Sequence, residues 1–262
     1  MENSSTSTPL APSPTTWSRK SFPVVLSIVA AIGAVFIVMF STLVYFAYLI
    51  ATQQLSRHFN PAHLPIRFVI ISQIVTYVPL IAYFLAVVPY LAQRSLADLG
   101  FRKPRWRDIG TAVAAAVLMC IVVEVTSALL AALTRIHASE SAAALLQEVH
   151  STPQKIGFIA IAVVFAPLVE EFAFRVFLYN AIARYSTTTI AAAISGAVFG
   201  LVHVIGLPAG SVITIALPLA LGGYILAMVY ARTGCYWANV ITHGLFNAVS
   251  VVAVLVFHVS DS

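Results

Sequence analysis

Three ionisable side chains stand close together in the apolar segment APLVEEFAFRVF, residues 166–177. Glu171 and Arg175 are four residues apart, so a helix places them on one face, where they can form an ion pair. Glu170 lies about 100° around that helix and points elsewhere. Charges within a bilayer cost roughly 2.5–3.5 kcal/mol each on insertion scales, and they are usually paired and functional. Pro167 lacks a backbone donor and is expected to bend this helix, which frees backbone groups near the carboxylates.

Two later apolar segments carry histidines. His203 ends the sequence FGLVH and follows Gly196 and Gly200, whose four-residue spacing lets another helix approach closely. His243 and Asn247, in HGLFN, are also four residues apart and share a helical face. Each of these groups, like the glutamates and the arginine, has a simpler interpretation as a polar contact that holds helices together.

The polar groups of the three segments are predicted to lie at similar depths in a membrane. Glu170 is 14 residues from the basic Arg184, and His243 is 11 residues from Arg232. At 1.5 Å per residue these separations are about 21 Å and about 16 Å. His203 is 19 residues beyond Arg184, and part of that distance is a turn. Carboxylate, imidazole and amide groups at one level can activate water and stabilise the oxyanion of a tetrahedral intermediate.

Three motifs occur in order: E-E-x-x-x-R, F-x-x-x-H beginning at Phe199, and H-x-x-x-N. Together they resemble the CPBP family of intramembrane proteases, also called the CAAX-protease or Abi family, over residues 156–250. That family includes type II CAAX prenyl endopeptidases and bacteriocin self-immunity proteins. The resemblance implies the following roles: Glu170 and His203 activate water, His243 and Asn247 form the oxyanion site, and Glu171 and Arg175 support the first helix.

The chain departs from the family pattern at a few positions. Val176 follows the motif arginine where the family usually has glycine, and Asn239 stands where proline often precedes the last motif. The chain also ends soon after its seventh apolar stretch, whereas some relatives have an eighth span. None of these departures removes a reactive group.

A zinc site is the alternative to metal-free catalysis. Glu170, His203 and His243 could supply a set of two histidines and one glutamate with an open position for water. The motif H-x-x-x-N offers only one strong ligand, however, where the zincin helix H-E-x-x-H offers two. Because an amide is a poor zinc ligand and a good hydrogen-bond donor, the sequence favours a reaction without a metal cofactor.

The surrounding composition is that of a membrane protein. Of 262 residues, 60% are hydrophobic and 9% are charged, whereas soluble domains are about 45–50% apolar and about 25% charged. A spanning helix needs roughly 20 apolar residues. The predicted spans are 22–50, 67–92, 111–134, 156–183, 188–206, 211–231 and 235–258. We therefore predict an all-α, polytopic bundle of about seven transmembrane helices, with eight as the alternative count.

Three regions are expected along the chain. Residues 1–20 are rich in Ser, Thr and Pro, and we predict that they form a disordered tail. Residues 21–150 comprise the N-terminal transmembrane helices and a basic cytoplasmic loop. Residues 151–258 comprise the helices of the CPBP-like catalytic core.

Basic residues are distributed unevenly between the two sides of the predicted bundle. One side carries nine: Arg19, Lys20, Arg94, Arg102, Lys103, Arg105, Arg107, Arg184 and Arg232. The other side carries four: Arg57, Arg67, Arg135 and Lys155. This asymmetry predicts a cytoplasmic N-terminus. We expect the protein to be a multi-pass protein of the plasma membrane. The basic loop RSLADLGFRKPRWRDIG can also lie along an anionic membrane surface. Such charge beside spans is ordinary topology signalling and does not favour nucleic-acid binding.

Three functions remain open from the sequence. The first is an intramembrane endopeptidase that acts on a membrane-associated peptide or protein, prenylated or not. The second is a non-catalytic bacteriocin self-immunity or regulatory protein on the same scaffold. The third is a transporter in which Glu124, the two glutamates and the histidines relay protons or bind a cation. Since no inverted repeat is evident, transport ranks last, and the intact motif set favours catalysis.

Overall fold

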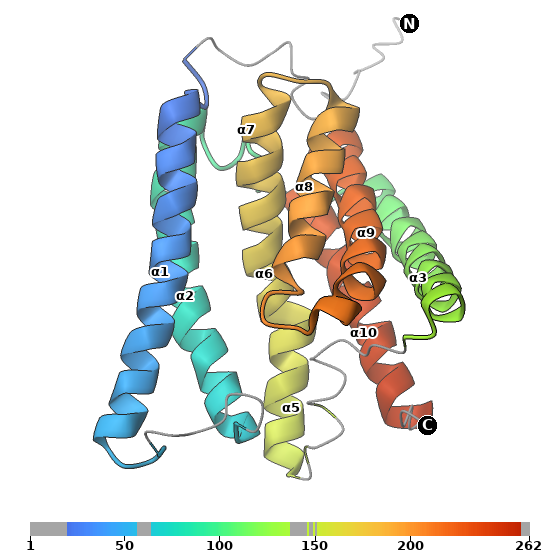
Figure 1. Cartoon of the computed structure of the whole chain (residues 1–262). Helices are drawn as coiled ribbons and strands as arrows, with labels where there is room; N and C mark the ends of the chain where they lie inside the picture. Colours follow the sequence, from blue (N-terminus) through green and yellow to red (C-terminus); the bar gives the residue numbers. More distant parts are fainter. Residues whose placement is uncertain (1–19, 57–63, 137–145, 147–148, 150, 258–262) are drawn as a thin grey trace, which may run out of the picture.

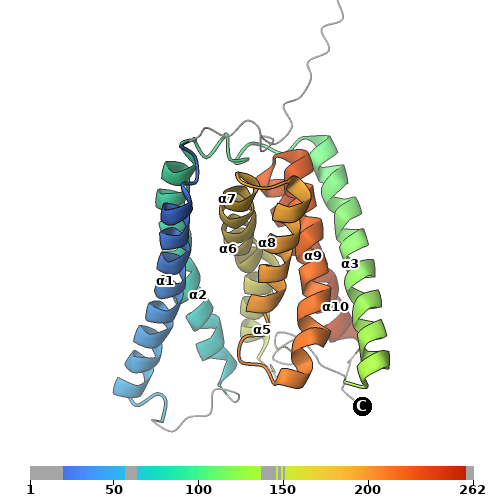
Figure 2. The ribbon, with the colours of Figure 1, turned by 45° about the horizontal axis from the view of Figure 1, so that its top comes forward.

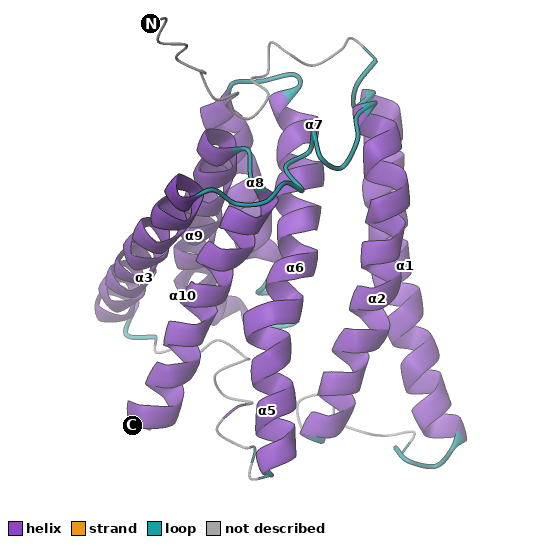
Figure 3. Ribbon diagram, turned by 180° about the vertical axis from the view of Figure 1, so that it is seen from behind, coloured by secondary structure: helices purple, strands orange, loops and turns teal. Residues whose placement is uncertain are grey.

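The computed structural model describes residues 20–56, 64–136, 146, 149 and 151–257. Within these ranges every regular element is a helix (Figure 3), so the all-α prediction is confirmed. The main elements are α1 (Val24–Ala51), α2 (Ile66–Ala92), α3 (Trp106–Thr134), α5 (Thr152–Ala160), η3 (Ile161–Phe165), α6 (Ala166–Glu171), η4 (Phe172–Tyr179), α7 (Asn180–Ala183), α8 (Thr188–Val202), η5 (Ala209–Ser211), α9 (Val212–Thr233) and α10 (Tyr236–Phe257). The tail predicted to be disordered lies, except for Lys20, outside the described residues.

Six helical stretches of the described chain are long and apolar enough to cross a membrane, and α8 is a shorter apolar helix. The prediction of a polytopic bundle with about seven helices is confirmed. The predicted span 188–206 is shorter than expected, because α8 has 15 residues and ends at Val202. At 1.5 Å per residue it is about 22 Å long, less than the roughly 30 Å of the hydrocarbon core.

One long helix, Thr152–Ala183, runs through the middle of the bundle (Figure 1). It consists of α5, η3, α6, η4 and α7 in direct succession, and the wide π-helical turns of η3 and η4 flank α6. Pro167 stands in the first turn of α6, inside the continuous helix, so its missing N–H leaves one carbonyl of the preceding turn without its helical partner. The surrounding helices α2, α8, α9 and α10 all contact η4, so the centre of the long helix faces protein on several sides.

The helices α8 and α9 pack against each other at very short range. A Cβ on Gly196 would lie 2.6 Å from the carbonyl oxygen of Ala220, and one on Gly200 would overlap the carbonyl oxygen of Ala216. The close approach predicted from the four-residue glycine spacing is therefore confirmed. The hairpin of α1 and α2 lies on the opposite side of the central helix from α3 (Figures 1 and 2).

The basic loop between α2 and α3 packs onto the turn that joins α9 to α10. Leu99 is buried, and its carbonyl accepts a hydrogen bond from the Tyr230 hydroxyl at 2.9 Å. The carbonyl of Gly100 accepts from the backbone N–H of Tyr236 at 2.9 Å. Arg102 donates to the carbonyl of Thr233 at 2.7 Å, which satisfies one free carbonyl at the end of α9. This loop thus fixes the start of α10, the helix that carries the last motif.

Candidate active site

Glu171 and Arg175 form the ion pair that their spacing predicts. The Nε atom of Arg175 lies 3.1 Å from Oε2 of Glu171, and both side chains are 0% exposed. The Arg175 guanidinium also donates from Nη2 to the carbonyl of Gly223 at 3.2 Å and stands 4.8 Å from the centre of the Phe199 ring. Its Nε is not aligned for a hydrogen bond, and Nη1 has no partner among the described residues. The arginine therefore contributes mainly charge to this pair.

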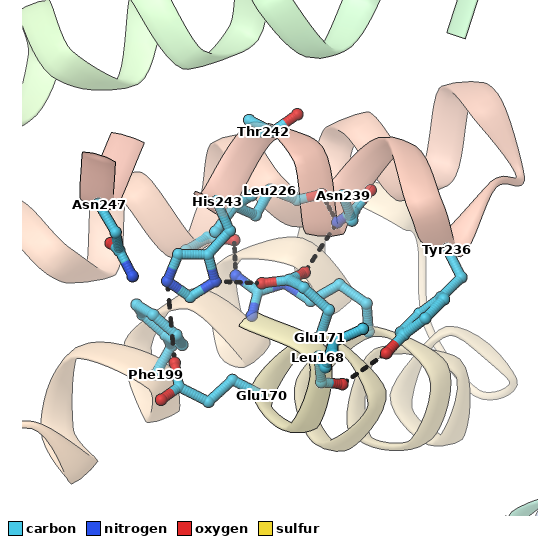
Figure 4. A network of polar contacts seen from close by, with 12 residues as sticks. Leu168, Glu170, Glu171, Phe199, Leu226, Tyr236, Asn239, Thr242, His243 and Asn247 are labelled. Atoms are coloured by element: carbon cyan, nitrogen blue, oxygen red, sulfur yellow. Dashed lines mark hydrogen bonds and ion pairs between the residues drawn. The ribbon is translucent and has the colours of Figure 1, made fainter. Parts of the chain in front are cut away.

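Two neutral groups donate to the same carboxylate from α10. Oε1 of Glu171 lies 2.8 Å from Nδ1 of His243, and Oε2 accepts from Nδ2 of Asn239 at 2.9 Å. An ionised carboxylate can only accept hydrogen bonds, so Nδ1 of His243 must carry a proton. The other ring nitrogen, Nε2, is then turned toward Glu170 (Figure 4).

Glu170, on α6, lies against side chains from α2, α10 and the end of α8. Its Oε2 is 3.8 Å from Nε2 of His243 and 4.0 Å from Nε2 of His203. Its Oε1 accepts from the hydroxyl of Tyr77, on α2, at 3.3 Å. The side chains of Glu170 and His203 are 17% and 22% exposed, so this carboxylate is reachable from outside the protein, unlike that of Glu171.

His203 follows the last residue of α8 and faces Glu170 with one ring nitrogen. Its Nδ1 lies 2.7 Å from the carbonyl oxygen of Phe199, one turn earlier. Since a carbonyl oxygen can only accept, Nδ1 carries the proton and Nε2 presents a lone pair when the ring is neutral. His203 and His243 thus adopt the same tautomer for different reasons.

Asn247 also lies at the site, but its amide already has a partner. Nδ2 donates to the carbonyl of Ala162 at 2.7 Å. In η3 the N–H of Ala166 bonds the carbonyl five residues earlier, and the next such bond would come from Pro167, which has no N–H. The expectation that proline frees a backbone group near the carboxylates thus identifies the carbonyl that Asn247 occupies. One amide hydrogen of Asn247 remains for other contacts.

The structure brings together Glu170, His203 and His243 directly, places Asn247 beside them on α10, and puts Glu171 and Arg175 behind them. Glu124 is exposed on α3, a helix that packs against α9 and α10.

The sequence interpretation missed two residues of the site. Asn239 was noted only as a departure from the family pattern, although it precedes His243 by one helical turn, as His243 precedes Asn247. That repeated four-residue spacing could have assigned it to the same helical face. Tyr77 had no comparable signal, since a single tyrosine in an apolar span is common at any depth.

Residues 152–249 match the family model for type II CAAX prenyl endopeptidase Rce1-like proteins. This segment is Rce1-like. The resemblance recognised from the three motifs is thereby confirmed, and all six motif residues fall within the matched range. No curated protein and no solved structure matches the chain. The chain is thus a multi-pass integral membrane protein in which residues 152–249 are similar to a CAAX-type protease family.

Proposed function

We propose that the protein is an intramembrane endopeptidase that hydrolyses a peptide bond with water activated by Glu170 and His203. One observation carries this proposal: a partly exposed carboxylate lies within 4.0 Å of Nε2 of two histidines from different helices, at a position enclosed by membrane-spanning helices. Charged and polar groups at that depth are costly, so a purely structural role would be an expensive use of them.

The spacing of these groups suits one water molecule. Two hydrogen bonds of about 2.8 Å that meet at about 90° span about 4 Å, which agrees with the 4.0 Å between Glu170 and His203. Both groups are acceptors in the neutral tautomer, so a bridging water donates its two hydrogens and presents a lone pair to the substrate carbonyl. Glu170 takes one proton as the oxygen attacks the carbonyl carbon. Glu170 then returns that proton to the leaving amine as the C–N bond breaks.

The oxyanion of the tetrahedral intermediate needs donors. We assign them to Nε2 of His243 and the second amide hydrogen of Asn247. Since Nδ1 of His243 donates to Glu171, Nε2 carries no proton in the resting enzyme. It becomes a donor to the oxyanion when it takes over the proton that Glu170, 3.8 Å away, has removed from the water, and the proton passes back to Glu170 before it reaches the leaving amine. The buried carboxylate of Glu171 faces the resulting cation at 2.8 Å, which is the arrangement by which an acidic residue stabilises an imidazolium in a catalytic triad.

The residue types at this site are suitable zinc ligands, but the distances between them are too long for one zinc ion. Metal-binding histidines usually donate their other ring N–H to a carboxylate or a carbonyl, as His243 and His203 do. Ligands of one tetrahedral zinc, at about 2.0–2.1 Å each, lie about 3.3–3.4 Å apart. The nitrogens here are 3.8 Å and 4.0 Å from Glu170, and no three His, Cys, Asp or Glu side chains of the described residues are spaced to hold a metal. The arrangement does not fit zinc as it stands, and we propose no step through a metal.

The substrate we propose is a membrane-associated peptide, with a prenylated C-terminal CAAX peptide as the first candidate because of the Rce1-like segment. Residues 151–258 would then form the catalytic core, in a protein of the plasma membrane with a cytoplasmic N-terminus. A non-catalytic self-immunity or regulatory protein on the same scaffold is the alternative.

The test is a cleavage assay with the purified protein in liposomes. Prenylated CAAX peptides and their unprenylated counterparts are offered to the wild type, to Glu170→Gln and to His203→Ala. We expect the wild type to cleave, and each variant to lose at least about a hundredfold in rate while accumulating normally. If wild type and Glu170→Gln cleave equally, Glu170 is not the base. If the wild type cleaves no membrane peptide, the non-catalytic alternative stands.

A further inference from the structure

Asn239 connects three helices at the back of the site. From α10, its Nδ2 donates to Oε2 of Glu171 on α6 at 2.9 Å and to the carbonyl of Leu226 on α9 at 2.7 Å. The residue is 0% exposed. Its orientation is fixed, because a reversed amide would bring Oδ1 against two acceptors. Figure 4 shows the amide pointing from α10 toward the glutamate.

This amide makes a contact that no other residue in the described part of the chain supplies. Arg175 lies 3.1 Å from the same oxygen, but its Nε is not aligned for a hydrogen bond. Among the described residues, Asn239 therefore provides the aligned hydrogen bond to Oε2 of Glu171. With Oε2 held in this way, Oε1 faces Nδ1 of His243 at 2.8 Å.

We propose that Asn239 is a positioning residue that sets the tautomer of His243 through Glu171. With Asn239 in place, the carboxylate stays ionised and oriented, Nδ1 of His243 carries the proton, and Nε2 faces Glu170. Without it, Glu171 is free to rotate or to take up a proton, and a protonated carboxyl can donate to Nδ1 and reverse the tautomer. The effect on catalysis rests on the proposed endopeptidase function, whereas the effect on the tautomer does not.

The matched pair of variants is Asn239→Leu and Asn180→Leu. Asn180 is also a buried asparagine whose Nδ2 makes two hydrogen bonds, to the carbonyl of Val176 at 3.0 Å and to the hydroxyl of Tyr230 at 3.1 Å. Both changes remove two buried hydrogen bonds and keep a similar side-chain volume, so both should lower the melting temperature. Only Asn239→Leu removes a donor to Glu171.

The first readout is ¹⁵N NMR of histidine-labelled protein in bilayers, with the signals of His243 identified by their loss in His243→Gln. We expect protonated Nδ1 and unprotonated Nε2 in the wild type and in Asn180→Leu, and a mixture of tautomers in Asn239→Leu. If Asn239→Leu does not accumulate, Asn239→Ala replaces it, because its side chain has no donor for Glu171 or Leu226. An unchanged tautomer in the Asn239 variant overturns the proposal, whether or not the wild type cleaves any peptide.

The second readout is kinetic and uses the cleavage assay described above. We expect kcat to fall about tenfold or more in the Asn239 variant, with KM within about twofold of the wild type, because the lost hydrogen bond is to a charged group that acts on the transition state. Asn180→Leu should keep the kcat of the wild type. Equal losses of kcat in the two variants would assign Asn239 a structural role only and overturn the proposal.

Discussion

Removal of one charge from the buried pair should destabilise the protein more than removal of both. Arg175→Met takes away the cation and leaves the carboxylate of Glu171 at 0% exposure. Glu171→Gln does the converse and leaves a fully buried guanidinium whose Nη1 already lacks a hydrogen-bond partner among the described residues. The double variant removes both charges and keeps similar volumes. These three proteins and the wild type form a double-mutant cycle.

The magnitude follows from the burial of the two groups. An orphaned buried charge destabilises a protein by about 3–5 kcal/mol, whereas replacement of the whole pair is often close to neutral. Each single variant should therefore lose about 3–5 kcal/mol, which corresponds to about 6–20 °C in melting temperature at about 2–4 °C per kcal/mol. Glu171 keeps two neutral donors, His243 and Asn239, so Arg175→Met should be the milder of the two. The double variant should lose less than either single variant, so the coupling energy of the cycle should be at least about 3 kcal/mol, at or above the upper end of the usual range for residues in contact.

The assay is thermal unfolding of the four purified proteins in one detergent at one scan rate, together with their accumulation in membranes. Arg107→Met is the control, because Arg107 is exposed and substitutions on an exposed surface usually change stability by no more than about 0.5 kcal/mol. Additive losses in the double variant would refute the reasoning, since they would mean that neither charge depends on the other. A loss in Arg175→Met no larger than in Arg107→Met would do the same.

Four further outcomes are expected. Tyr77→Phe should lower the cleavage rate by at most about tenfold, because it removes one hydrogen bond worth about 0.5–1.5 kcal/mol from Glu170; a loss as large as that of Glu170→Gln would give Tyr77 a direct role. Gly100→Ala should lower the free energy of unfolding by about 1–3 kcal/mol, because the φ of Gly100 is 96° and an added Cβ would lie 3.0 Å from two backbone atoms. Gly110→Ala is the matched variant in the same melting assay: Gly110 has open space around it, so this change should be neutral or slightly stabilising. In a cysteine-free background, an introduced cysteine at Pro208 should react with an impermeant reagent from outside and one at Lys103 should not; the reverse pattern would invert the topology. Elemental analysis should find no stoichiometric zinc, and a strong chelator should leave cleavage intact; activity lost on stripping and restored by zinc would establish a metalloprotease.

Hydropathy predicts the helices well, and its errors have local causes. The second span was predicted at 67–92 and is Ile66–Ala92. The third was predicted from 111 but begins at Trp106, because Asp108 accepts from the backbone of Arg105 and from the Arg102 side chain, and such capping is invisible to an apolar average. The fifth was predicted to reach 206 but stops at Val202. Its last apolar residues form a turn in which Gly206 adopts a φ of 87°, a conformation that favours glycine.

Contacts between site residues on the same helix could be predicted from the sequence, whereas contacts between residues on different helices could not. The four-residue spacing between Glu171 and Arg175 alone predicts their contact. The contact between Tyr77 and Glu170 joins residues 93 positions apart and depends on how α2 packs against α6, which no local pattern encodes. Asn239 falls between these cases, because its helical face was readable and its partner on another helix was not.

Two adjacent glutamates divide the chemistry because a single residue step turns them about 100° apart on the helix. Both carboxylates lie close to the imidazole of His243: Oε1 of Glu171 is 2.8 Å from Nδ1, and Oε2 of Glu170 is 3.8 Å from Nε2. The first carboxylate is fully buried and has the arginine and the asparagine as partners, so its charge can fix the ring. The carboxylate of Glu170 is partly exposed and lies beside Nε2 of the two histidines and the hydroxyl of Tyr77. It is therefore the carboxylate that water and substrate can reach. An exchange of the two roles would require the reactive carboxylate to leave the ion pair with Arg175, which burial makes costly. The order of the residues in the motif therefore determines which glutamate can act as the base.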